Sequence, residues 1–446
     1  MSASLLPSDS AAAHRSRDLL AEFPQLIDLP GLPQARMLVE YIIGRRLREL
    51  DVSGRDAAGA FIDAENTADV PHRIIVVDDA KGIQTALLRP LAEVAVHHDR
   101  IDESRAAASI ADVPEIPDLG QTESAHSAAG RAASAVEGNP ETWAVINAPK
   151  ATSALAESIA ALQPHVSAII VIGRSDSMSR AVNKELARGF GRVDVSPGVG
   201  KHRMIIGSRP LSAPSLPSFP KRGVITHPRV GDLEVRAHGA CFSGVRSDEG
   251  STLLLDALIE TLPGSATAAN PIAAGDDGTA ADSAALSKPE SILDLGCGNG
   301  WLLTAAMRAT GALRGTGVDV SKAAVASARG TVEANGIDAD IVTGDAADPD
   351  DPGVAQLGPF DLIVLNPPFH QGTAIETDTA GAMMAAAASH LAPDGVVITV
   401  FNTHLRYRDR LEAIIGHSEQ LARNKKFTVV ASRGRSATYS PGPRRR

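Results

Sequence analysis

Cysteine, aromatic residues and long apolar runs are all scarce in this sequence. The two cysteines, Cys241 and Cys297, lie far apart and lack the spacing of a metal-binding motif. This argues against a disulfide-rich secreted scaffold and against a cysteine-ligated zinc site, and it fits a reducing cytoplasm. No run of about 18 apolar residues occurs, and the start of the sequence lacks the pattern of a signal peptide. We therefore expect a cytoplasmic protein with no membrane segment and no bound metal.

Basic residues are fewer than acidic residues in the chain as a whole, which has a formal net charge of −10. Its distribution is uneven, however. Residues 174–222 contain ten Lys and Arg against three acids, and residues 401–446 contain eleven against three. Such clusters can bind a polyanion even in an acidic chain, although solvated helix faces and a charged tail give the same pattern. The charge pattern thus leaves a nucleic-acid partner open.

A chain of 446 residues is too long for one compact core, and we expect two domains. Two stretches near 102–140 and 264–288 are rich in Ala, Ser, Gly, Asp and Pro, which is typical of flexible inserts. We place an N-terminal α/β domain at 1–230, and a second domain with a basic C-terminal tail at 235–446. The sequence does not indicate the oligomeric state.

Short apolar segments alternate with helical patterns in both halves of the chain. Strand, loop and helix in repeated order predict parallel strands with right-handed crossovers, so both domains are expected to be Rossmann-like, doubly wound α/β folds. Ligands of such sheets bind at the carboxyl ends of the strands. The expected strand segments are 73–79, 142–148 and 166–174 in the first half, and 291–300, 314–321, 339–346, 360–369 and 394–402 in the second; the expected helices include 151–163, 321–335 and 379–391.

A glycine-rich turn follows the first strand of the second half, in the segment LDLGCGNGWL. Gly296, Gly298 and Gly300 stand at alternate positions, and Asp294 precedes them by two residues. Glycines allow a tight turn and a close approach of the backbone to a ligand, and the helix that follows can present free amide groups. The spacing differs from the dinucleotide fingerprint. The preceding acid disfavours a pyrophosphate and suits a ligand with a cationic amine.

Two further acids end the next two strands. Asp319 lies in GTGVDVS, where a carboxylate can accept hydrogen bonds from both hydroxyls of a ribose, and Asp345 lies in VTGDAAD, where it could meet an adenine edge. Each acid alone could equally be a turn or helix-cap residue. Three acids on successive strand ends favour a nucleoside-containing ligand.

This series over roughly residues 289–400 resembles the class I S-adenosylmethionine-dependent methyltransferases. In that family the glycine loop and the first acid hold the methionine end of the cofactor, the second acid binds the ribose, and the third lies beside the adenine. The resemblance implies S-adenosylmethionine as the cofactor. The cofactor-binding residues that it implies are Asp294, Gly296, Gly298, Gly300, Asp319, Asp345, Ala346 and Asn366.

The segment DLIVLNPPFHQ ends an apolar strand on a rigid corner made of Asn366, Pro367, Pro368 and Phe369. Beside the cofactor, the Asn366 side-chain oxygen and the Pro367 carbonyl could accept hydrogen bonds from both N–H groups of a planar amine and hold it in line with the methyl group. Phe369 could stack on the base. An Asn-Pro-Pro turn with a buried Phe is the plainer structural alternative. The four-residue pattern resembles that of methyltransferases acting on adenine N6, guanine N2, cytosine N4 or glutamine amides, and these four residues are the predicted catalytic set.

A wider set of segments resembles the bacterial ribosomal RNA guanine-N2 methyltransferases of the RsmC/RlmG type. It includes NPPFHQ, NTHLRY, ARNKKFTVVAS, the segment at 238–258 and the segment at 174–206. The resemblance implies a cofactor-free N-terminal domain that positions RNA, a catalytic C-terminal domain and a ribosomal RNA substrate, 23S rather than 16S. The role of His370 stays open between RNA contact and capping of its loop.

Two other functions remain open from the sequence. The cofactor chemistry could act on a protein glutamine or on DNA adenine N6, although the Phe-His ending speaks against a glutamine methyltransferase. A non-catalytic RNA-binding or assembly protein could also keep this fold, but such a scaffold would not need Asp294, Asp319 and Asn366 together.

Overall fold

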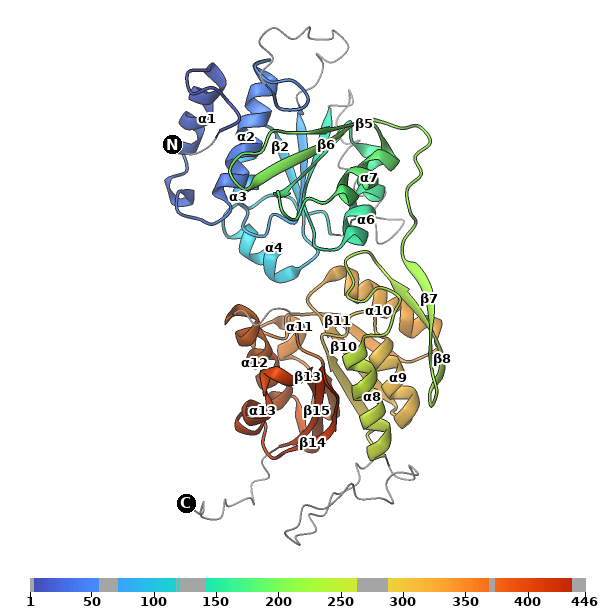
Figure 1. Ribbon diagram of the computed structural model, residues 1–446. Coiled ribbons are helices and arrows are strands. Elements are labelled where there is room, and N and C mark those ends of the chain that lie inside the picture. Colours follow the sequence, from blue (N-terminus) through green and yellow to red (C-terminus); the bar gives the residue numbers. More distant parts are fainter. Residues whose placement is uncertain are drawn as a thin grey trace. The chain divides into compact units, whose positions relative to one another are not determined.

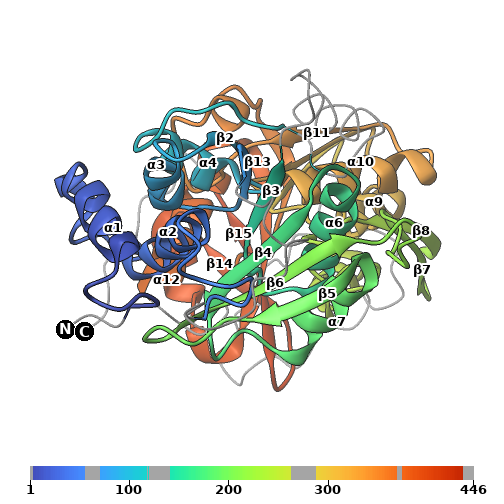
Figure 2. The ribbon, with the colours of Figure 1, turned by 90° about the horizontal axis from the view of Figure 1, so that it is seen from above.

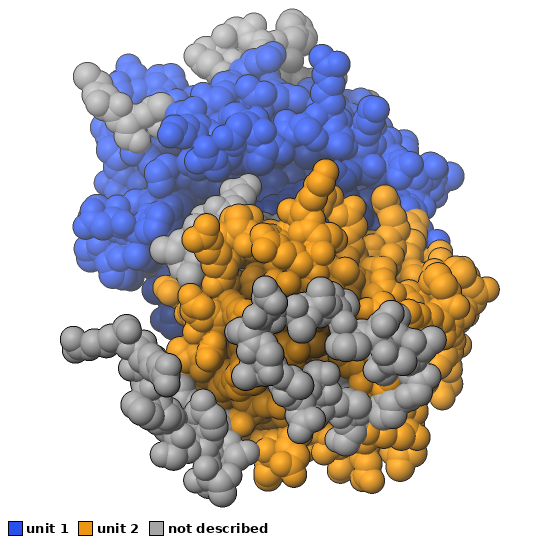
Figure 3. Space-filling view, turned by 60° about the horizontal axis from the view of Figure 1, so that its bottom comes forward, with its two compact units in different colours: residues 1–220, 238–240 blue, residues 221–237, 241–446 orange. Residues whose placement is uncertain are grey.

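The computed structural model describes residues 4–55, 71–117, 119, 141–262, 288–368 and 374–434. The chain divides into two compact units, which are coloured in Figure 3. The first unit comprises residues 1–220 and 238–240, and the second comprises residues 221–237 and 241–446.

The first unit is built on a six-stranded sheet with the order β2-β1-β3-β4-β6-β5. Seen from above, β3, β4, β6 and β5 follow one another in that order (Figure 2). Neighbouring strands from β2 to β4 are parallel, whereas β6 pairs antiparallel with β4 and with β5. The strands are β1 (Arg73–Val77), β2 (Glu93–His97), β3 (Thr142–Asn147), β4 (Ala168–Arg174), β5 (Phe190–Val195) and β6 (His202–Pro210); the helices are α1 (Ala11–Ala21), α2 (Leu32–Arg46), α3 (Ile83–Leu88), α4 (Ile101–Ala108), α6 (Thr152–Leu162) and α7 (Arg180–Gly189).

Alternate residues of these strands enter two apolar cores, one on each face of the sheet. Ile74 and Val76 pack with α2, whereas Ile75 and Val77 pack with α6 and α7. Figure 1 shows the same division, with α1, α2 and α3 on one side of the sheet and α6 and α7 on the other. Burial on both faces explains why β1, β3 and β4 were readable as continuous apolar runs.

The second unit repeats this plan around a seven-stranded sheet with the order β11-β10-β9-β12-β13-β15-β14. A separate hairpin, β7 and β8, packs its Leu233 and Val235 into the same core as α8, α9 and α10. The other face of the sheet is covered by α12 and α13 (Figure 1). The strands are β7 (Lys221–His227), β8 (Gly231–Ala237), β9 (Ser291–Leu295), β10 (Arg314–Asp319), β11 (Ala339–Thr343), β12 (Phe360–Leu365), β13 (Leu391–Asn402), β14 (Ser418–Arg423) and β15 (Phe427–Arg433); the helices are α8 (Glu249–Thr261), α9 (Trp301–Thr310), α10 (Lys322–Ala334), α11 (Pro352–Ala355), α12 (Ala374–Ser389) and α13 (Arg408–Ile414).

The fold class expected from the sequence, two doubly wound α/β domains, agrees with both sheets. The division between the units differs from the expected 230/235 boundary. It falls after Pro220, because the buried side chains of the β7–β8 hairpin belong to the core of the second unit.

The insert expected at 102–140 is partly ordered structure. Helix α4 covers its beginning, and the backbone N–H of Ile116 donates to the Val96 carbonyl at 2.7 Å, which ties the segment to β2. Residues 102–117 of the expected insert are therefore structured, through hydrogen bonds that an Ala- and Ser-rich sequence does not indicate. The remainder of that insert (except Leu119), residues 264–287 and the basic tail from residue 435 lie outside the described residues.

Candidate active site

The predicted site residues of the second unit gather at the carboxyl ends of adjacent strands. Strand β9 lies between β10 and β12, so the segments that follow these three strands meet at one edge of the sheet. The chain reaches β10 through α9 and returns to the other side of β9 only at β12. This reversal of strand order is the position where doubly wound sheets bind ligands.

The glycine-rich turn lies directly after β9. Gly296, Gly298 and Gly300 all have positive φ, at 82°, 53° and 76°. A Cβ atom on Gly300 would lie 2.9 Å from the Cα of Ala328, so this glycine also lets α9 approach α10 closely. A Cβ atom on Gly298 would meet nothing within 4 Å, which leaves open space above the turn.

The backbone amides of this turn are mostly paired with groups of β10 and of the turn itself, which differs from the expected set of free amides. The N–H groups of Gly296 and Cys297 donate to the Val318 carbonyl at 2.8 and 3.0 Å. The N–H of Gly298 donates to Asp319 at 3.0 Å, and the N–H of Trp301 donates to the Asn299 side chain at 3.1 Å. The turn therefore offers a fixed shape and two carboxylates to a ligand, rather than a row of unused donors.

Asp294 is a buried carboxyl group with an unused oxygen. Its side chain is 2% exposed, and Oδ2 has no hydrogen-bond partner among the described residues. Burial, with a contribution from the nearby negative charge of Asp319, raises the pKa of Asp294 to about 8, although the backbone N–H of Leu303 opposes the shift. A cation brought to this oxygen would supply the missing partner and favour the ionised carboxylate.

Asp319 and Asp345 lie at the ends of the next two strands, as predicted. Asp319 accepts from the N–H of Gly298 and from the N–H of Ser321, both at 3.0 Å, so each carboxylate oxygen is oriented by the backbone. Asp345 accepts from the N–H of Ala347 at 2.9 Å, and Ala346 beside it is buried. A carboxylate oxygen has more than one lone pair, so both acids can still accept hydrogen bonds from a ligand.

Asn366 follows β12 and faces helix α8 with its amide nitrogen. Nδ2 donates to Asp248 Oδ2 at 3.0 Å and to Ser251 Oγ at 2.9 Å. Oδ1 is buried and has no partner in the described part of the chain. An unpaired buried carbonyl oxygen is costly, and a ligand N–H group is one way to satisfy it.

The proline corner is only partly described. Pro367 is buried and Pro368 is exposed, whereas Phe369 and His370 lie outside the described residues. The stacking by Phe369 therefore stays a prediction, and the role of His370 stays open between RNA contact and capping of its loop.

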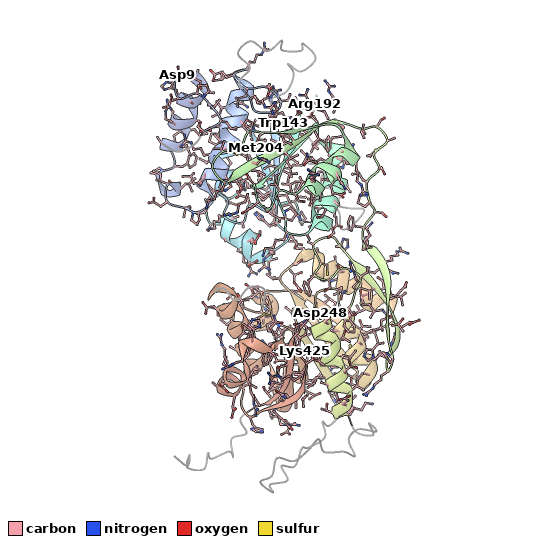
Figure 4. The ribbon with its side chains drawn as sticks, in the orientation of Figure 1. Asp9, Trp143, Arg192, Met204, Asp248 and Lys425 are labelled. Carbon is pink, nitrogen blue, oxygen red and sulfur yellow. The ribbon has the colours of Figure 1, made fainter. Side chains whose placement is uncertain are left out.

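Three residues that contact the site were not singled out from the sequence. Asp248 caps the N-terminus of α8 (Figure 4), and Ser251 lies in the first turn of that helix. Asn299 donates from Nδ2 to the Gly244 carbonyl at 2.7 Å, which ties the glycine-rich turn to the segment before α8. The sequence signal for Asp248 was an N-cap pattern, which indicates a helix start but not a partner 118 residues away.

Part of the positive charge expected at the surface is paired with nearby acids. Within residues 174–222, Arg174, Arg188 and Arg192 each pair with an acid two or three positions away, so part of that local charge is neutralised. Among the described residues, no helix is long and apolar enough to cross a membrane, and no group of three or more His, Cys, Asp or Glu side chains could hold a metal ion.

The second unit matches a known protein family. The family profile described as Methyltransferase small domain matches residues 272–431. Ribosomal RNA small subunit methyltransferase C of Serratia proteamaculans is 31% identical over 48% of this chain and 51% of its own length, and that of Pseudomonas aeruginosa is 34% identical over 46% and 52%. The chain spans about half the length of these curated relatives.

A solved structure matches over most of the chain. The Thermus thermophilus 16S rRNA N2 G1207 methyltransferase, in complex with AdoMet and guanosine, superimposes with a TM-score of 0.62 over 81% of this chain and 88% of its own, at 22% identity. This likeness covers both units and establishes the fold.

Proposed function

We propose that this chain is a class I S-adenosylmethionine-dependent methyltransferase of the RsmC type and that it transfers a methyl group to the exocyclic N2 amino group of a guanine in ribosomal RNA. The observation that carries the proposal is Asn366. Its buried Oδ1 has no partner among the described residues, and it stands at the strand end beside the strand that carries Asp294.

The residues around the glycine-rich turn suit S-adenosylmethionine. The unused Asp294 oxygen suits the cationic amine of the methionine moiety, and the open space above Gly298 leaves room for the chain that joins this moiety to the nucleoside. Asp319 would bind the ribose hydroxyls, and Asp345 with Ala346 would lie against the adenine. When bound, this cofactor supplies an electrophilic methyl group on a sulfonium.

The strand-end corner would orient the acceptor amine. The N2 lone pair of guanine is delocalised into the ring, so the amine is a poor nucleophile until it is held in line with the methyl group. Asn366 Oδ1 and the Pro367 carbonyl would accept from its two N–H groups and favour the positive charge that develops on nitrogen. Phe369 would stack on the base. The product nitrogen can lose its proton to water, and we assign no general base.

We propose 16S rather than 23S rRNA as the substrate. The sequence resemblance favoured 23S, but the relatives carry the name of a small-subunit methyltransferase, and the similar solved structure is that of a 16S rRNA methyltransferase. The first unit would position the RNA, with its basic residues between 174 and 209 contacting phosphates. Such contacts predict an affinity that falls steeply with salt.

The proposal is tested by mass-spectrometric nucleoside mapping of 16S and 23S rRNA from a strain that lacks this protein and from its parent. We expect one N2-methylguanosine to disappear from 16S rRNA and to return with the wild-type gene but not with Asn366→Ala. Loss of an N2-methylguanosine from 23S rRNA instead would show that the large-subunit RNA is the substrate. Unchanged rRNA in both subunits would contradict the proposal and direct the search to protein glutamines and DNA adenines.

A further inference from the structure

We propose that Asp248 is a positioning residue for methyl transfer. Its carboxylate fixes the orientation of the Asn366 amide and strengthens Oδ1 as the acceptor for the substrate amine. The inference rests on the proposed function, and it concerns a residue on helix α8 rather than on the strand ends that carry the cofactor and substrate groups.

The contacts of Asn366 are divided between its two amide atoms. Both hydrogens of Nδ2 have partners on α8, which are Asp248 Oδ2 at 3.0 Å and Ser251 Oγ at 2.9 Å. Oδ1 is buried and lacks a partner in the described part of the chain. The donor side of the amide is therefore occupied by the protein, and the acceptor side is the part left for a ligand.

The charge of Asp248 determines which way the amide points. A flipped amide would bring Oδ1 to within about the same distance of a carboxylate oxygen, and two acceptors would then face each other without a proton between them. A serine in place of Asp248 could accept from Nδ2 but could also donate to Oδ1, so it would permit both orientations. A carboxylate permits only the orientation in which the Asn366 amide nitrogen faces it.

Asp248 is itself held by the start of α8. Its Oδ2 accepts from the N–H of Ser251 at 3.0 Å and from Ser251 Oγ at 3.4 Å, in addition to Asn366. The helix is anchored by fully buried Leu254, Leu255 and Leu258. The carboxylate therefore has little freedom to follow a moving Asn366, and the amide is aligned before substrate arrives.

The carboxylate also affects the acceptor strength of Asn366. Hydrogen bonds in a chain polarise one another, so a negative charge at Nδ2 draws the amide hydrogens toward Asp248 and shifts electron density to Oδ1. Positive charge grows on the substrate nitrogen during methyl transfer. An acceptor made more negative in this way stabilises the transition state more than the ground state.

The first unit contains a second strand-end asparagine that lacks this arrangement. Val77 of β1 pairs with Ile146 of β3, and Asn147 ends β3; in the second unit Leu295 of β9 pairs with Leu365, and Asn366 follows. The two asparagines thus hold equivalent places next to equivalent strands.

The two asparagines differ at their oxygens, whereas both amide nitrogens donate; Asn147 Nδ2 donates to the Val77 carbonyl at 3.1 Å. Asn147 Oδ1 accepts from Gln34 Nε2 at 2.6 Å and from Gln84 Nε2 at 2.5 Å. Gln34 is the third residue of α2, as Ser251 is of α8. In the first unit, the glutamines donate to the asparagine oxygen, so that oxygen is occupied within the protein. In the second unit, Asp248 accepts from the asparagine nitrogen, and the oxygen is left for a ligand.

The experiment compares Asp248→Asn, Asp248→Ala and Ser251→Ala with the wild type. Asn caps a helix about as well as Asp, so Asp248→Asn keeps the cap and removes the charge. Ser10→Ala is the matched control, because Ser10 caps α1 of the first unit through a bond from the Ala13 N–H at 3.0 Å. Steady-state kinetics with 16S rRNA and S-adenosylmethionine give kcat and KM separately.

We expect kcat to fall about tenfold in Asp248→Asn, since a charge-assisted hydrogen bond is roughly twice as strong as a neutral one. In Asp248→Ala the amide is no longer held, and we expect kcat to fall about 100-fold. Ser251→Ala should fall between these two. The KM for S-adenosylmethionine should stay near that of the wild type in all three, and Ser10→Ala should keep the wild-type kcat.

A second measurement follows the amide itself and does not need activity. The side-chain NH₂ resonance of Asn366, assigned by its loss in Asn366→Ala, should be protected from hydrogen exchange in the wild type and should lose that protection in Asp248→Ala. Retained protection, or an unchanged kcat in Asp248→Ala, would overturn the positioning role. Loss of protection together with a wild-type protein that methylates no rRNA would uphold the alignment of the amide and refute the proposed function.

Discussion

A buried carboxyl group without a partner makes Asp294 a source of pH-dependent stability. Its pKa in the folded chain is about 8, against a usual value of 3.8, so between these values the folded chain holds a proton that the unfolded chain has released. The stability that this proton contributes is complete below about pH 4 and is lost as pH rises through about 8.

Asp294→Asn should remove this dependence. Measured by urea unfolding without cofactor, the variant should gain stability relative to the wild type as the pH rises from 5 to 9. The same variant should bind S-adenosylmethionine more weakly, because a neutral amide cannot pair with its amine. A stability difference that does not change with pH would show that Asp294 is ionised in the free protein.

Substitutions of Asn366 and of Asp319 should affect different quantities, namely the rate of methyl transfer and the affinity for the cofactor. Asn366→Ala removes an acceptor for the amine and should abolish methyl transfer while sparing cofactor affinity. Asp319→Ala should mainly raise the Kd for the cofactor, because it removes the expected ribose acceptor and the partner of the Gly298 amide. The cofactor Kd from calorimetry and the kcat of each variant distinguish the two roles. If Asn366→Ala weakened cofactor binding and Asp319→Ala lowered only kcat, the assigned roles would be reversed.

At the residue scale, the sequence indicated polar groups at strand ends and missed the two residues that accept from the Asn366 amide. Asp294, Asp319 and Asn366 each lie at or directly after the end of a strand, which is a local pattern. Asp248 and Ser251 lie 118 and 115 residues from Asn366 in the chain. Only the packing of α8 brings them together, and no local pattern encodes that contact.

Among the elements, the close packing of α9 on α10 depends on Gly300. Gly300→Ala would carry both the strain of a positive φ and a contact of 2.9 Å with Ala328. The matched control is Gly336→Ala, which has a φ of 62° but open space around its Cβ position.

We expect Gly336→Ala to cost about 1–2 kcal/mol of unfolding free energy from its backbone conformation alone. Gly300→Ala should cost roughly 1–3 kcal/mol more, because the added methyl group forces two helices apart. Urea unfolding curves for the two variants test this. Equal losses of unfolding free energy in the two variants would mean that α9 and α10 move apart without an energetic cost.

Most of the apolar strands were readable from the sequence, whereas the more polar strands were not. Strands β1, β3, β4, β9 and β12 are apolar runs, and each was expected at its place. The hairpin β7–β8 and the strands β5 and β14 each contain two or three charged residues and include exposed positions. Their pairing depends on neighbours that are distant in the sequence.

For the whole molecule, the position of the hairpin sets the true start of the second unit. A fragment of residues 221–446 keeps Leu233 and Val235 in its core, and a fragment of residues 241–446 loses them. We expect the shorter fragment to have the lower Tm, since each fully buried Leu or Val side chain contributes about 1.5–3 kcal/mol. Equal Tm values would show that the hairpin is dispensable for this core.

The two strand-end asparagines have a consequence for the redesign of this fold. In the first unit, two glutamine side chains donate to the oxygen of Asn147, so a ligand N–H group would have to displace them. The first unit therefore has an amide oxygen at the strand end that matches Asn366 Oδ1, but the protein itself occupies it. An engineer who wished to reopen that corner would begin with Gln34 and Gln84, not with the asparagine.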